Sequence, residues 1–237
     1  MHPTNHVHDG HPLQLWVSPT PWRAISSAPL GGGVGLRGWV VNATVPADYG
    51  RTDPEAHLRE IAEHLGLGGP GVGLLTAVDV RAAVTVEQDG VVVTATTGVG
   101  APTWAAAGAA AVPYRPGTIN VVVQLPVALT DAALVNLVGT VTEAKTQAML
   151  TFGVAGTGTA TDTVTALCPP PALCPPAPCP PAPEHDGAGA PEVFGGTRSV
   201  WGSRTASAVF DAVTAGLVVD RARIDALTAQ GYQPWPV

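Results

Sequence analysis

The stretch LVNLVGTVTEAKTQAMLTFGVAGTGTATD, from Leu134 to Asp162, decides how the rest of the chain is read. Its first part predicts a long helix, because apolar residues recur at about 100° per residue and form one stripe. Thr130 and Asp131 precede the stripe and are typical of a helix N-terminus. The stripe consists of Leu134, Leu137, Val138, Val141, Ala148 and Met149, and the opposite face carries Asn136, Thr140, Glu143 and Gln147.

Lys145 lies within the apolar stripe and not on the polar face, where a solvated lysine is expected. It is the only lysine in a chain whose Lys and Arg total 11. A sequence that otherwise uses arginine indicates that this position needs a compact ammonium, or an amine able to lose its proton. The alternative is a long side chain that reaches past the stripe to solvent. Both interpretations stay open at this stage.

Two glycine-rich segments are candidate ligand loops. Gly156 to Asp162 places three threonine hydroxyls and one carboxylate among glycines, and Ser26 to Gly33 ends in three consecutive glycines. Glycine allows positive φ and close approach of the backbone to a ligand. The alternatives are a glycine helix end that leads into a strand for the first segment, and a mobile hairpin connection for the second.

Composition excludes several classes of partner. The 237 residues suit one domain, and the net charge of −7 without any run of Lys or Arg argues against nucleic acid and against an anionic membrane surface. No apolar run approaches the ~20 residues of a membrane span. Residues 1–13 contain four histidines and do not resemble a signal peptide, so we expect a cytoplasmic protein.

The order of the elements predicts an α+β fold, with a mixed or largely antiparallel sheet and packed helices in a single domain. A doubly wound parallel sheet is the alternative. Asp89-Gly90, between two β-branched runs, is the strongest hairpin signal. The expected strands are 13–17, 22–26, 38–45, 73–80, 82–87, 91–97, 116–126 and 161–167, with a turn at 18–21; the expected helices are 54–65, which Asp53 caps, the helix of the opening stretch, 203–217 and 220–230.

The chain divides into a main domain at 13–217 and two flanking parts. Residues 1–12 are expected to form a flexible His-rich tail, and 218–237 a peripheral helix and tail. The segment 168–190 is a degenerate Pro-rich repeat that predicts an extended, disordered insert. Its three cysteines match neither a zinc spacing nor a disulfide framework, and the histidines of the 54–65 helix are read as boundary residues. These residues are Cys168, Cys174 and Cys179 in the insert, His2, His6, His8 and His11 in the tail, and His57 and His64 in the helix.

Four blocks of sequence together resemble one enzyme family. They are ISSAPLGGG at 25–33, WVVNATVPADYGRTDP at 39–54, PGTINVVVQLPVALTDAALVN at 116–136, and EAKTQAML followed by GTGTATD. Long blocks in this order resemble adenosylcobinamide amidohydrolases. The resemblance implies a corrinoid substrate, adenosylcobinamide, whose aminopropanol amide is hydrolysed to give adenosylcobyric acid in cobalamin salvage. The sequence shows no zinc or HExxH-type spacing, and we expect neither a cofactor nor a metal.

Amide hydrolysis needs a nucleophile, a base, and donors aimed at the oxyanion. No triad spacing selects among the candidates, so several residues remain for each role. A non-catalytic corrinoid-binding protein is the alternative function. The candidates are Ser26, Ser27, Thr157, Thr159 or a water as nucleophile; Lys145 or a carboxylate such as Asp162 as base; the amides of Gly31, Gly32 and Gly33 with Asn42 or Asn120 as donors; and Asp48 and Thr118 as further substrate contacts.

The Pro-rich insert is expected to be dispensable, because proline fixes φ and removes backbone donors, so the segment can neither join a sheet nor order itself. Deleting residues 168–190 should leave the melting temperature and the turnover nearly unchanged. A thermal melt and an activity assay check this. A loss of several degrees would show that the insert packs against the domain.

Overall fold

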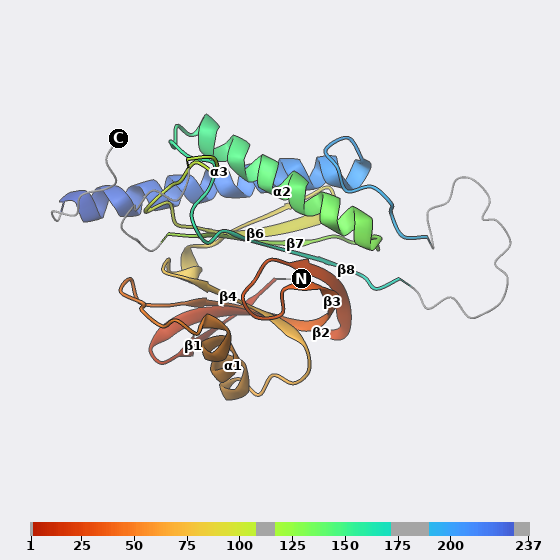
Figure 1. The fold of residues 1–237 in the computed structure, drawn as a ribbon, viewed down its shortest axis with the longest axis horizontal. Coiled ribbons are helices and arrows are strands. Elements are labelled where there is room, and N and C mark those ends of the chain that lie inside the picture. Colours follow the sequence, from red (N-terminus) through yellow and green to blue (C-terminus); the bar gives the residue numbers. More distant parts are fainter. Residues whose placement is uncertain (1, 108–116, 172–189, 230–237) are drawn as a thin grey trace, which may run out of the picture.

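One eight-stranded sheet carries the three α-helices of the described chain (Figure 1). The computed structural model describes residues 2–107, 117–171 and 190–229. The strands run in the order β4-β3-β2-β8-β7-β6-β5, and β1 pairs with the first half of β2. The elements are β1 (Thr4–His8), β2 (His11–Ser26), β3 (Gly33–Thr44), α1 (Pro54–His64), β4 (Gly71–Thr76), the 3₁₀ helix η1 (Val80–Ala82), β5 (Val84–Gln88), β6 (Val91–Thr97), β7 (Ile119–Gln124), α2 (Asp131–Thr151), β8 (Thr163–Cys168) and α3 (Val200–Ala229).

The sheet folds on itself, so the molecule has four layers (Figure 1). Helix α1 packs on the outer face of β2 and β3 through Leu58 and Ile61. Helices α2 and α3 cover the outer face of β5 to β8 and form the largest core cluster with it. Between the two halves lies a third apolar cluster, in which Trp16 and Val40 meet Val122 of β7. Both faces of most strands are therefore buried.

The layer between the two halves changes from apolar to polar along the strands. Residues two apart in a strand point to the same side of the sheet. Each strand that places an apolar side chain in this inner layer therefore also places there the side chain two positions away. These neighbours are polar and buried toward one end of the layer. The pairs are Val40 and Asn42, Leu74 and Thr76, Val122 and Asn120, and Leu167 and Thr165.

The predicted long helix is confirmed as α2, with both ends capped. The Thr130 hydroxyl accepts a hydrogen bond from the Ala133 N–H at 3.2 Å, and Asp131 lies in the first turn, where the helix dipole favours a negative charge. At the other end Gly153 has φ +87°, and the Val154 N–H donates to the Met149 carbonyl at 2.9 Å. This is the Schellman arrangement, and it uses Gly153 and not Gly156.

The α+β prediction with a mixed sheet is confirmed. The β3–β4 and β7–β8 pairs are parallel, and the other pairs are antiparallel. Strands and helices do not alternate one by one, as a doubly wound sheet requires. The hairpin at Asp89 and Gly90 is also confirmed, with φ of 50° and 83° at these two residues.

Three predictions for the first half of the chain are wrong. Residues 13–26 do not form two strands with a turn at 18–21; β2 is continuous and shifts register between Val17 and Trp22. The two prolines were read as turn residues, whereas they lie in this irregular part of the strand. Residues 4–8 are β1 and not a flexible tail, because they pair with the start of β2. Asp53 occupies the N-cap position of α1 but makes no side-chain cap, since its carboxylate binds Arg51.

Two boundaries near the end of the chain are also corrected. The predicted helices 203–217 and 220–230 are one helix, α3, and Asp220 is a buried part of it whose carboxylate accepts from the Val99 N–H at 2.8 Å. Residues 218–229 therefore continue α3, with Asp220 and Ile224 buried and most of the other described side chains exposed. Cys168 is the last residue of β8 and is buried. The deletion proposed above is consequently limited to residues 172–189, which with Cys174 and Cys179 lie outside the described residues.

The glycines of the 26–33 segment support packing, contrary to our interpretation. A Cβ atom on Gly31 would lie 1.8 Å from the Gly71 carbonyl oxygen, and one on Gly32 would lie 2.7 Å from the Ala28 carbonyl oxygen. Gly33 has no atom near its Cβ position within 4 Å. The close backbone contact at Gly31 closes this loop over β4.

We expect Gly31→Ala to destabilise the protein much more than Gly33→Ala. Both residues have positive φ, +72° and +83°, so the strain of a left-handed alanine is about equal in the two variants. The clash with Gly71 adds roughly 1–3 kcal/mol to the free energy lost in Gly31→Ala. Urea denaturation of both variants checks this, and equal losses would contradict the packing role.

Candidate active site

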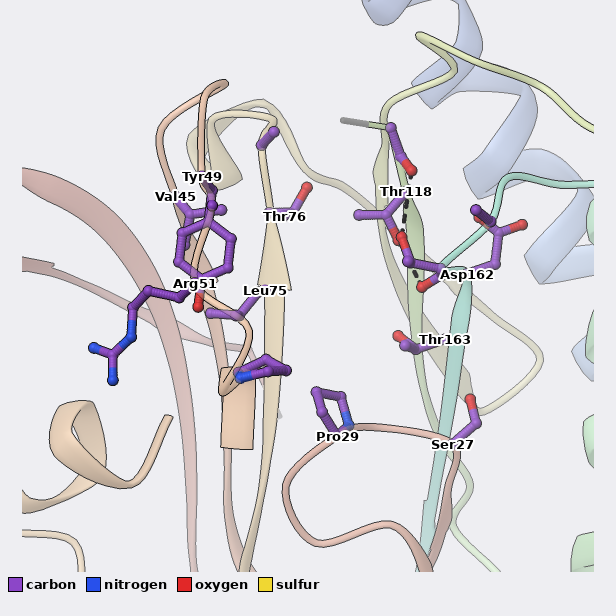
Figure 2. Close-up of a pocket in the computed structure, with 16 residues that line it drawn as sticks. Ser27, Pro29, Val45, Tyr49, Arg51, Leu75, Thr76, Thr118, Asp162 and Thr163 are labelled. Carbon is purple, nitrogen blue, oxygen red and sulfur yellow. Dashed lines mark hydrogen bonds between the residues drawn. The ribbon is translucent and has the colours of Figure 1, made fainter. Parts of the chain in front are cut away.

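A cavity of about 640 Å³ opens between the two halves of the sheet (Figure 2). Its floor lies where β3 and β4 end and where β7 and β8 begin, at the polar end of the inner layer. The volume is within the range of small-molecule sites. The lining residues are Ser27, Pro29, Val45, Tyr49, Gly50, Arg51, Pro54, Leu75, Thr76, Ala77, Gly117, Thr118, Ala160, Thr161, Asp162 and Thr163.

The cavity has two different walls. Figure 2 shows Tyr49, Val45 and Leu75 on one side and Thr118, Asp162 and Thr163 on the other. The first wall comes from the β3–α1 segment and the end of β4, and it is mostly apolar. The second comes from the segments before β7 and β8, and it presents hydroxyls. A ligand with an apolar part and an amide part suits this division.

Lys145 and Asp162 form a buried ion pair at the second wall. Their side chains are 7% and 13% exposed, and the Nζ of Lys145 donates to Oδ2 of Asp162. Asp162 also accepts from the Thr159 N–H at 3.0 Å, from the Thr159 hydroxyl at 2.5 Å and from the Ile119 N–H at 2.9 Å. The alternative in which Lys145 reaches solvent is wrong. Asp162 is one of the lining residues, but its carboxylate points away from the cavity, toward Lys145 of α2 (Figure 2).

This pair differs in energy from the exposed ion pairs of the described chain. The Arg81–Asp79 pair is 68% and 42% exposed, and such pairs contribute about 0–1 kcal/mol. Removing one partner of a buried pair costs roughly 3–5 kcal/mol, because the other charge is left buried. With four accepted hydrogen bonds, the Asp162 carboxylate has few lone pairs left to take a proton. Its geometry therefore suits an anchoring charge better than a general base.

Ser26 and Ser27 have different surroundings. Ser26 is buried; its hydroxyl lies 2.8 Å from the Thr165 hydroxyl and accepts from the Ala28 N–H at 3.1 Å. Ser27 lines the cavity, and its hydroxyl oxygen accepts from the Val164 N–H at 3.0 Å. That bond uses a lone pair and not the hydroxyl proton, so Ser27 can still donate to a ligand. The structure thus separates two neighbouring serines that the sequence left equivalent.

Asn42 and Asn120 join the two halves of the sheet. The Nδ2 of Asn120 donates to the Asn42 side-chain oxygen and to the Leu75 carbonyl, both at 2.9 Å. Thr163 donates to Oδ1 of Asn120 at 2.8 Å, and Thr118 donates to the Thr161 carbonyl at 2.9 Å. The two asparagines lie beneath the cavity floor and do not line it. Thr118 and Thr163 carry this network to the surface of the cavity.

Several predicted site residues do not line the cavity. The Thr157 hydroxyl accepts from the Ala105 N–H at 2.9 Å and so holds a neighbouring loop. Asp48 is exposed, while its neighbour Tyr49 lines the wall. The lining also lacks Gly31, Gly32 and Gly33. The loop that contains them contributes Ser27 and Pro29 to the cavity instead. The roles of all these residues in the reaction stay predictions.

Sequence reasoning missed Tyr49, Arg51 and Thr76, because each depends on how distant segments meet. It also missed Gly158, whose Cβ would lie 2.6 Å from both Oδ2 of Asp162 and Nζ of Lys145. The sequence did contain a signal for Gly158: this glycine lies four residues before Asp162, in the loop that follows the helix of Lys145. Only glycine leaves room for the pair.

No group of three or more His, Cys, Asp or Glu side chains in the described ranges is arranged to hold a metal ion. Within those same ranges, none of the helices has the length and apolar character needed to cross a bilayer.

The fold and cavity define an α+β protein with a hydroxyl-lined small-molecule site. Residues 2–174 match the model of a family described as adenosylcobinamide amidohydrolase. The adenosylcobinamide amidohydrolase of Methanosarcina mazei is 32% identical over 143 residues, which cover 60% of this chain and 68% of that protein. The chain therefore belongs to the adenosylcobinamide amidohydrolase family, and it is a hydrolase that acts on amide bonds. The resemblance seen in the sequence is confirmed.

One solved structure was also compared, the L-aminopeptidase D-Ala-esterase/amidase from Ochrobactrum anthropi. It shares 14% identity and a TM-score of 0.41, with 92% of this chain and 83% of that chain covered. A similarity this low supports no argument about the present chain.

We expect Lys145→Met to lower the free energy of unfolding by about 3 kcal/mol or more, because Asp162 would remain charged and buried without its cation. Arg81→Met, which breaks an exposed pair, is the matched control and should cost under about 1 kcal/mol. Urea denaturation measures both. In the double variant Lys145→Met/Asp162→Asn the loss should be smaller than the sum of the single losses. A Lys145→Met variant as stable as the parent would contradict the ion-pair argument.

Proposed function

We propose that this enzyme hydrolyses the amide between the propionyl side chain of the corrin ring and the aminopropanol arm of adenosylcobinamide. Water adds across the C–N bond; the acyl carbon gains the oxygen and leaves as adenosylcobyric acid, and the nitrogen gains a proton and leaves as aminopropanol. The product would re-enter corrinoid synthesis in cobalamin salvage, in the cytoplasm. Membership of the amidohydrolase family is the observation that carries this proposal.

The cavity supports the proposal through its chemistry. The periphery of a corrin ring is rich in amides, and amides need both donors and acceptors. The second wall offers hydroxyls of Ser27, Thr118 and Thr163 in a partly enclosed site. The arm that carries the reacting amide is the part of the substrate that this cavity is suited to hold.

Ser27 is the residue that we propose to stabilise the oxyanion. Its oxygen accepts from Val164, which aims the remaining proton away from the backbone. A fixed donor at the developing negative charge acts without reorganisation in a water-poor site. A serine nucleophile would need a base within hydrogen-bond reach, and the Asp162 carboxylate is already occupied by its four donors. Because the Ser27 hydroxyl cannot be both the oxyanion donor and the nucleophile, we propose a water molecule as the nucleophile; its base is a group other than Asp162.

Asp162 and Lys145 are proposed to order the wall that faces the amide. Lys145 acts through Asp162 and does not touch the substrate, so it is a positioning residue. Asp162 fixes the Thr159 backbone and the first residue of β7, Ile119. Loss of the pair would therefore move Thr118 and Thr163 as well as remove a charge.

Incubating the purified protein with adenosylcobinamide should release adenosylcobyric acid and aminopropanol, which mass spectrometry detects. Ser27→Ala should lower kcat by about 10²–10³, the usual effect of losing one oxyanion donor. Ser26→Ala is the control, because its hydroxyl is buried against Thr165. That variant should change stability more than turnover.

Intact substrate with the parent protein, under conditions in which a known family member is active, would refute the proposed reaction. An unchanged kcat in Ser27→Ala with normal turnover by the parent would instead refute only the role of Ser27. A covalent acyl-enzyme trapped on Ser27 would replace the water mechanism by nucleophilic catalysis.

A further inference from the structure

Tyr49 supplies the aromatic ring of the cavity lining, from the segment between β3 and α1. Its ring stacks on the His57 ring of α1, with centroids 5.5 Å apart and an angle of 20° between the planes. Its hydroxyl oxygen lies 3.0 Å from Nδ1 of His57. The Tyr49 N–H also donates to the Pro46 carbonyl at 3.0 Å and closes a turn. His57 therefore contacts both the ring and the hydroxyl of Tyr49 from outside the cavity, and Figure 2 shows Tyr49 on the apolar wall.

The rest of this segment is also tied to α1. Arg51 donates to both oxygens of Asp53, at 2.9 and 2.8 Å, and to both oxygens of Glu60, at 2.7 and 2.9 Å. Each contact is exposed and weak by itself, but together with the Tyr49–His57 pair they connect the wall to a helix. Helix α1 packs on the outer face of β2 and β3. The apolar wall is thus held by a different layer from the one that holds Asp162.

His57 is neutral at pH 7 in these surroundings. Burial lowers the pKa of His57, and the positive charge of Arg51 lowers it further, while Glu60 opposes the shift. The other charged or titratable groups that act on His57 are His8, which lowers its pKa, and Asp53, which raises it. We take His57 as the neutral tautomer with its proton on Nε2, in which Nδ1 accepts from the Tyr49 hydroxyl.

We propose that Tyr49 positions the macrocyclic part of the substrate and that His57 is a positioning residue acting through Tyr49. The inference rests on the proposed function, since it divides the same substrate between the two walls. The hydroxyl wall receives the amide arm, and the Tyr49 wall, with Val45 and Leu75, receives the flat apolar part of the ring system. A ring held at a fixed angle binds a flat ligand with little loss of conformational entropy.

The test separates the two parts of the substrate. Adenosylcobyric acid, the proposed product, keeps the macrocycle and lacks aminopropanol, so its inhibition constant reports on binding of the macrocycle without the aminopropanol arm. In Tyr49→Ala we expect KM and this inhibition constant to rise together by about tenfold, the effect of losing one aromatic contact with its area. The kcat value should stay within about threefold. Tyr49→Phe, which keeps the ring, should change both constants less.

Variants at His57 test the positioning role. His57→Leu removes the acceptor and should raise KM severalfold, whereas His57→Asn keeps an acceptor near the position of Nδ1 and should restore most of it. His64→Leu is the control on the same helix, because the His64 ring contacts His8 and does not approach Tyr49. In the parent, KM should rise as the pH falls through the lowered pKa of His57, below about 6.5, because the imidazolium no longer accepts the phenol proton. His57→Asn should lose this dependence.

Three outcomes would overturn the inference. They are an unchanged KM in Tyr49→Ala, a rise in KM without a rise in the product's inhibition constant, and an equal effect of His64→Leu and His57→Leu. Binding of both corrinoids is also followed by quenching of tryptophan fluorescence, which requires no turnover. Absence of turnover in the parent together with weaker corrinoid binding in Tyr49→Ala would refute the proposed reaction and keep the inference about the wall.

Discussion

The structure depends on one buried charge contact, the ion pair of Lys145 and Asp162. Its carboxylate also accepts from the backbone at Thr159 and Ile119, so α2, the loop after it and the first residue of β7 meet at a single group. A buried charge is tolerated only when its partners are complete, which makes the loop geometry hard to change. The absence of a side chain at Gly158 follows from the same contact, since a Cβ there would collide with both charges.

The position of the cavity follows from the polarity of the inner layer. Two halves of one sheet face each other through apolar side chains at one end and through amides and hydroxyls at the other. Asn42 and Asn120 bond to each other across the gap, so polar groups there are paired and the two halves are held in register. Beyond them the halves separate, and Thr118 and Thr163 become the floor of the cavity. The same strands that form the inner layer therefore determine where the cavity lies.

The two walls of the cavity belong to different layers, and this separates recognition from chemistry. Asp162 and Ser27 are fixed by β8 and by α2, whose packing forms the largest core cluster. Tyr49 and Arg51 are fixed by α1 on the opposite side of the molecule. The part-buried and exposed contacts that Tyr49 and Arg51 make with α1 are weaker than the buried Lys145–Asp162 pair. Substitutions in the apolar wall should therefore cost less stability than substitutions in the wall that holds Asp162.

The sequence by itself determined the α+β class, the N-terminal cap of α2, the Asp89-Gly90 hairpin, the family, and the unusual character of Lys145. Each depends on local periodicity, on turn chemistry or on long matching blocks. The tertiary structure decided which candidates line one cavity. It separated Ser27 from Ser26 and Tyr49 from Asp48, and it revealed close packing at Gly31 and Gly32. It also joined segments that looked peripheral, such as β1 and the end of α3. These results depend on partners distant in sequence: a strand's register and the burial of a charge are set by what lies opposite, which local patterns do not encode.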